Sequence, residues 1–135
     1  MRKLTFILLL VLSLSLVACK GGGSTPTESG KEAMNVGDAA AGKKLFEEGA
    51  QPPCSNCHSL KPGVDLFGPS LAKVGAVAGA RASGQSAEDY FRQSILEPNV
   101  QIVEGFTPNV MHLTYGDELS EQEVNDLVAY LLTLK

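Results

Sequence analysis

Two cysteines and a histidine in residues 51–58 form the most specific chemical pattern in this sequence of 135 residues. Cys54 and Cys57 are separated by two residues and His58 follows directly, so the segment has the form Cys-x-x-Cys-His. In covalent c-type haem attachment, each thiol adds to one vinyl group of a haem and the adjacent imidazole becomes the proximal iron ligand. The spacing therefore predicts one covalently bound haem c, held by Cys54, Cys57 and His58.

A Cys-x-x-Cys pair also occurs in thioredoxin-like redox sites, in structural disulfides and in zinc sites. A thioredoxin-like motif lies beside a βαβ pattern, and the sequence has no strand-rich segment. A structural zinc site is usually closed by four ligands, and the other histidine, His112, lies far along the chain. Few chemistries other than haem attachment need the two thiols and the imidazole in this order.

The first helix that could position these residues begins near Asp38, which is a good N-cap, and extends to about Gly49. Gly42 lies inside this helix beside apolar Phe46. A glycine is costly within a helix, so Gly42 predicts that another backbone approaches closely there.

Two further helices are predicted from their capping residues. Ser86 caps the first of them, which Pro98 ends, and aromatic residues at helical spacing form its inner face. Ser120 and Glu123 form a capping box at the start of a C-terminal helix whose apolar residues recur to the end of the chain. The domain is therefore expected to be all-α, with about 100 residues and one cofactor to complete its core.

With these elements in place, residues 37–135 resemble the class I cytochromes c of bacteria. In that family a glycine and an aromatic residue of the N-terminal helix, here Gly42 and Phe46, meet the C-terminal helix and the two helices cross. The resemblance implies a small class I fold around one covalently bound haem. It also implies that Ala129 or Tyr130 meets Gly42 and Phe46.

The resemblance assigns further residues to the haem site. In the family, a Gly-Pro-x-Leu segment places a prolyl carbonyl on the haem histidine, which implies that Pro69 accepts a hydrogen bond from Nδ1 of His58. An arginine after a glycine near this place often pairs with a haem propionate, which would be Arg81. Arg81 as an ordinary surface residue stays an open alternative.

The sixth iron ligand is expected to be Met111, which occupies the family's ligand position in the loop before the last helix. A thioether opposite a histidine raises the potential of haem iron. The family usually has a proline after this methionine, and here His112 replaces it. His112 is therefore an alternative sixth ligand, and Met111 is favoured because His/Met is the common pairing.

The resemblance implies a one-electron carrier in a respiratory or photosynthetic chain, and not an enzyme with a small-molecule substrate. The C-terminal part of the chain also resembles the monohaem subunit of alternative complex III and the cytochrome domains of haem-copper oxidase subunits. Redox proteins or a membrane respiratory complex are the expected partners. The main alternative is a haem enzyme or gas sensor, in which the sixth iron position is open.

The N-terminal segment predicts export and lipid attachment. Basic residues precede an apolar run at 4–17, which is too short to span a bilayer comfortably. The run ends in Leu-Val-Ala-Cys, which resembles the lipobox of bacterial lipoproteins, and Cys19 is the cysteine that haem attachment leaves over. We therefore expect a signal peptide at 1–18, a lipidated Cys19 followed by a flexible linker through 36, and a cytochrome c domain at 37–135. The domain would lie on the outer face of a bacterial membrane.

The charge balance argues against nucleic acid as a partner. The sequence has 11 basic and 15 acidic residues, for a net charge of -4. Removal of residues 1–18 takes away two basic residues and leaves a net charge of -6. Binding to phosphate backbones requires basic surfaces, so the mature domain is a poor candidate for that role.

Overall fold

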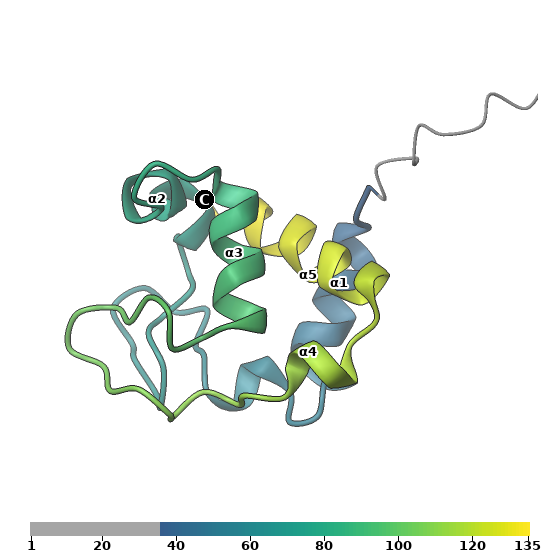
Figure 1. The fold of residues 1–135 in the computed structure, drawn as a ribbon, viewed down its shortest axis with the longest axis horizontal. Coiled ribbons are helices and arrows are strands. Elements are labelled where there is room, and N and C mark those ends of the chain that lie inside the picture. The colour runs from purple at the N-terminus through teal and green to yellow at the C-terminus, as the bar shows by residue number, and fades with distance from the viewer. Residues whose placement is uncertain (1–35) are drawn as a thin grey trace, which may run out of the picture. The chain divides into compact units, whose positions relative to one another are not determined.

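The computed structural model describes residues 36–135, which contain helices and no strand. The predicted signal peptide and Cys19, with nearly all of the linker, lie outside these residues. The all-α prediction is confirmed for this part of the chain (Figure 1). Within it, no helix has the length and apolar character needed to cross a membrane.

The first helix begins where the sequence predicted. The Asp38 carboxylate accepts a hydrogen bond from Ala40 N at 2.8 Å and so caps α1, Ala39–Lys44. The chain then continues without a break into a π-helical turn, η1, Leu45–Gly49. The predicted helix therefore has the expected extent, but its last turn is wider than an α-helix because Ala50 N donates to Leu45 O at 3.0 Å.

The C-terminal helix α5, Glu121–Thr133, crosses α1 and contributes many of the buried residues of the core. Its capping box is present, since Ser120 Oγ accepts from Glu123 N and Ser120 N donates to the Glu123 carboxylate at 2.8 Å. Phe46 is buried with its ring centroid 5.5 Å from that of Tyr130. The predicted contact between Phe46 and Tyr130 is therefore confirmed.

Gly42 is the point of closest approach between α1 and α5. A Cβ atom at this position would overlap the backbone carbonyl of Asp126 and lie 2.9 Å from Leu127 N. The predicted close approach is confirmed, and the nearest atoms of α5 belong to Asp126 and Leu127, not to Ala129 or Tyr130. Ala129 lies against Gly37, which precedes the N-cap of α1, and an added Cβ there would be 2.9 Å from the Ala129 Cβ.

Helix α3, Ala87–Leu96, packs on α5 and presents its aromatic face to the core. Ser86 caps it by accepting a hydrogen bond from Asp89 N at 3.0 Å, as predicted. Tyr90, Phe91 and Ile95 are buried. Arg92 also links this helix to the start of α5 through an ion pair of 2.7 Å with Glu121.

Two elements were not predicted. Helix α2, Val74–Arg81, packs against the end of α5, and Gly75 N donates to Leu134 O at 2.8 Å, which ties the C-terminus to α2 (Figure 1). A short helix α4, Tyr115–Glu118, precedes α5. The loop of residues 97–114 between α3 and α4 contains no regular element, and it carries Met111.

Candidate functional site

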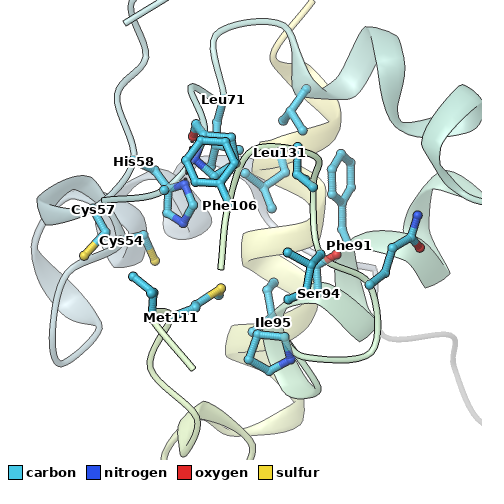
Figure 2. Close-up of a pocket in the computed structure, with 18 of the residues that line it drawn as sticks. Cys54, Cys57, His58, Leu71, Phe91, Ser94, Ile95, Phe106, Met111 and Leu131 are labelled. Carbon is cyan, nitrogen blue, oxygen red and sulfur yellow. Dashed lines mark hydrogen bonds between the residues drawn. The ribbon is translucent and has the colours of Figure 1, made fainter. Parts of the chain in front are cut away.

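A largely apolar cavity that opens to solvent lies beside α3 and α5. Its wall is formed by the segment around Cys54, residues 67–71, the inner face of α3 and the loop of residues 97–114. Figure 2 shows side chains from these segments directed into the same space. Its lining is predominantly apolar, with a few polar groups, as is typical of cofactor sites.

Cys54, Cys57 and His58 all line this cavity. A 3-10 turn, η2, Cys54–Asn56, brings them together, with Cys57 N and His58 N both donating to Cys54 O at 3.1 and 2.9 Å. Both thiols are free, so the pair is not a disulfide in the structure. Burial raises the pKa of the Cys54 thiol to about 11, so this thiol is protonated at neutral pH.

His58 is held by residues 68 and 69. Its Nδ1 donates to Pro69 O at 2.9 Å, the contact that the family resemblance implied. This bond leaves Nε2 with the lone pair that a metal ion requires. Burial lowers the pKa of His58, with the Pro69 hydrogen bond opposing, so the imidazole is kept neutral.

Met111 is distant from His58 in the sequence but lines the same cavity. Its side chain is half-buried, lines the cavity and packs against the core. Figure 2 shows His58 and Met111 entering the cavity from different segments. The structure thus brings an imidazole and a thioether to one space beside two free thiols.

A model of the family described as Cytochrome c matches residues 39–135. The chain belongs to the cytochrome c family. Members of this family bind a c-type haem covalently and act as electron-transfer proteins. This cytochrome therefore carries a covalent haem c, and redox proteins are its natural partners.

The described residues of the cytochrome fit this cofactor. Two free thiols and a neutral imidazole stand in the required order at the cavity wall, and the rest of the lining is mostly apolar. Gly68 allows the chain to pass directly over the histidine, because a Cβ there would overlap His58 Cε1. In residues 36–135, no group of three or more His, Cys, Asp and Glu side chains is arranged to hold a metal ion.

His112 lies in a different place from Met111, although the two are adjacent in sequence. It is not among the residues that line the cavity. Its Nε2 donates to the Glu118 carboxylate at 3.0 Å and lies 2.8 Å from Thr114 Oγ1. Its ring packs edge-on against Tyr115 with a centroid distance of 4.6 Å.

Arg81 ends helix α2 and lines the cavity with its side chain half-buried. Its backbone carbonyl accepts a hydrogen bond from Gln101 Nε2 at 2.5 Å. None of the ion pairs among residues 36–135 involves Arg81. Its pairing with a haem propionate stays a prediction.

Sequence reasoning missed two features of the site. Gly68 was part of the Gly-Pro segment, but nothing in the sequence showed that it touches the His58 ring. The Tyr115 hydroxyl donates to Pro52 O at 2.5 Å and joins α4 to the segment before Cys54. Burial raises the pKa of Tyr115, so its hydroxyl remains a donor. The one signal in the sequence for this contact was Tyr115 itself, an aromatic residue directly after the ligand loop.

Proposed function

We propose that this cytochrome is a monohaem class I electron carrier in which His58 and Met111 are the two axial ligands of the iron. The observation that carries the proposal is that both side chains line one cavity, whereas His112 is bonded to Glu118 outside it. A thioether opposite a histidine gives the high potential typical of cytochromes c. Bis-histidine ligation would lower that potential and change the role of the protein.

Each of the other site residues has a separate part in this proposal. Cys54 and Cys57 form the covalent links, and Pro69 fixes the His58 tautomer and raises the basicity of the free nitrogen. Arg81 supplies a cation at the cavity for a propionate. When bound, the haem supplies a one-electron couple between ferrous and ferric iron.

A spectroscopic experiment tests the ligand assignment. The full-length holoprotein is compared with Met111→Ala and His112→Gln in both oxidation states, and carbon monoxide is added to the ferrous forms. We expect Met111→Ala to lose the sixth-ligand signature and to bind carbon monoxide, while His112→Gln keeps the signature. Ready carbon monoxide binding by the wild type would instead favour a haem enzyme or gas sensor with an open position.

We further propose that Cys19 carries a lipid and tethers the domain to the outer face of a bacterial membrane. The support is the lipobox-like Leu-Val-Ala-Cys at residues 16–19 and the polar, glycine-rich segment that follows. Several acyl chains anchor a protein stably where one chain is marginal. Mass spectrometry of the mature N-terminus should find an acylated Cys19 and no residues 1–18. The Cys19→Ala variant should be released from membranes, and an unmodified Cys19 in the wild type would contradict the anchor.

A tethered carrier of this kind serves electron transfer at a membrane surface, in a respiratory or photosynthetic chain. The acidic mature domain suits partners with basic docking surfaces. Subunit membership in a quinol-oxidising complex and free diffusion on the tether predict different outcomes on mild solubilisation. A stable subunit co-purifies with other membrane proteins and is found by haem staining in a large complex, whereas a free carrier migrates alone.

A further inference from the structure

Two adjacent residues at the end of the ligand loop are both chemically able to bind haem iron. Met111 and His112 are adjacent, and both a thioether and an imidazole are known axial ligands of haem iron. The loop of residues 97–114 has no regular secondary structure that would fix which of the two faces the cavity. Some other interaction must therefore decide it.

His112 is held away from the cavity by contacts on two sides of its ring. Nε2 lies 3.0 Å from each oxygen of the Glu118 carboxylate and 2.8 Å from Thr114 Oγ1, so this nitrogen is fully engaged. The ring packs edge-on against Tyr115, which is buried and bonded to Pro52 O. An imidazole engaged in this way has to break these contacts before Nε2 can reach a metal.

The carboxylate that holds His112 is itself fixed. Thr114 Oγ1 donates to Glu118 Oε1 at 2.6 Å, and Glu118 N donates to Thr114 O at 3.1 Å across the single turn of α4. The hydrogen bonds from Thr114 and from His112 lower the pKa of Glu118, so the acceptor is ionised at neutral pH. Hydrogen bonds to an ionised acceptor are about twice as strong as neutral ones.

We propose that Glu118 and Thr114 are positioning residues that hold His112 outside the cavity and thereby keep Met111 as the iron ligand. The inference rests on the proposed function, because it assumes that Met111 is the ligand in the wild type. Because this pair is exposed to solvent, loss of the hydrogen bond should change the ratio of Met-ligated to His-ligated protein by about two- to five-fold.

The test follows the far-red absorption band that a methionine thioether gives to ferric haem. This band is recorded on the full-length holoprotein during a guanidinium titration, together with far-UV circular dichroism. In Glu118→Ala and in Thr114→Val, the band should disappear at lower guanidinium than in the wild type, before the helical signal changes. Asp117→Ala is the matched control, since Asp117 is an exposed acid on the same short helix, and it should leave the band midpoint unchanged.

A double variant separates ligand competition from simple loosening of α4. If released His112 displaces Met111, Glu118→Ala combined with His112→Gln should recover the wild-type band midpoint. If Glu118 only supports the loop, the double variant will be as weak as Glu118→Ala, and the inference is overturned. An unchanged midpoint in both Glu118→Ala and Thr114→Val overturns it as well.

Failure of the proposed function gives a different result. In that case the wild type itself lacks the thioether band, and Met111→Ala leaves its spectrum unchanged. A wild type with the band and a Glu118→Ala variant of equal midpoint contradicts only the positioning role.

Discussion

The crossing of α1 and α5 and the loop of residues 97–114 are stabilised by different kinds of contact. At the crossing, two backbones touch at Gly42, and the buried rings of Phe46 and Tyr130 pack beside them. The loop that carries Met111 contains no regular element, and exposed side-chain hydrogen bonds, such as those between Asn99 and Asn109, link its two ends. Main-chain contact in a close-packed interior admits no extra atom, whereas exposed hydrogen bonds are individually weak. The scaffold should therefore be the stronger part and the iron ligand the more easily displaced.

The largest effect is expected from Gly42→Ala. The new methyl group would overlap the Asp126 carbonyl, so α1 and α5 would have to separate along their whole contact. We expect the free energy of unfolding of the holoprotein to fall by more than about 3 kcal/mol, at or above the upper range for overpacked cores. Guanidinium denaturation followed by circular dichroism measures this loss.

Gly79→Ala is the matched control for this substitution. Gly79 lies within α2, and a Cβ atom there would meet nothing within 4 Å. Alanine in a helix interior is favoured over glycine by about 0.5–1 kcal/mol, so this variant should be slightly more stable than the wild type. Equal stability losses in the two variants would mean that helix propensity, and not the crossing, explains the effect at Gly42.

The scaffold was largely predictable because its signals are local. Asp38, Ser86 and Ser120 each begin a helix through hydrogen bonds to residues two or three positions away, and such patterns are visible in sequence. Helix α2 was missed because its residues are small and carry no amphipathic pattern. Its position depends on Gly75 meeting the backbone at Leu131 and Leu132, a contact between distant segments.

The site was predictable in its residues but not in its contacts. Cys54, Cys57 and His58 belong to one five-residue motif, so their chemistry could be inferred without knowledge of the fold. The separation of Met111 from His112 could not, because it depends on Glu118, six residues beyond the histidine. A sequence shows that both ligands are present, and only the fold shows which one faces the cavity.

Gly68→Ala should give the second largest effect and acts on the proximal side of the site. The new Cβ would overlap His58 Cε1, and Gly68 N is fixed by its bond to Cys57 O at 2.9 Å, so the imidazole has to move. We expect a weakened bond to Pro69, a shifted reduction potential and a stability loss of about 1–3 kcal/mol. Potentiometry and proton resonances of the His58 ring measure the change. A potential equal to that of the wild type would show that the ring tolerates the methyl group.

Asn99→Ala removes hydrogen bonds within the loop of residues 97–114 and should have a smaller effect than Gly68→Ala. Asn99 donates to Asn109 Oδ1 at 2.9 Å and accepts from Asn109 N at 2.8 Å, which closes the loop before Met111. Loss of both exposed bonds should cost about 1 kcal/mol locally. The thioether band should disappear earlier in guanidinium while global unfolding is nearly unchanged. Asn99→Asp keeps the acceptor, so its band midpoint should lie between those of the wild type and Asn99→Ala. Equal midpoints in all three proteins would show that these hydrogen bonds do not stabilise the loop.

The smallest effect is expected from Glu123→Gln, and it appears as a change in pH dependence. Hydrogen bonds from Ser120 lower the pKa of Glu123 below its ordinary value of 4.5, so the carboxylate stabilises the fold above that pH. This contribution should be lost as the pH falls through the lowered folded value, which loosens α5 at its first turn and leaves the loop contacts intact. Denaturation midpoints at pH 7 and pH 3 should therefore differ less in Glu123→Gln than in the wild type. Glu48→Gln removes an exposed carboxylate outside the capping box and should keep the wild-type pH dependence. If both variants flatten it equally, general surface charge, and not the cap of α5, controls stability in acid.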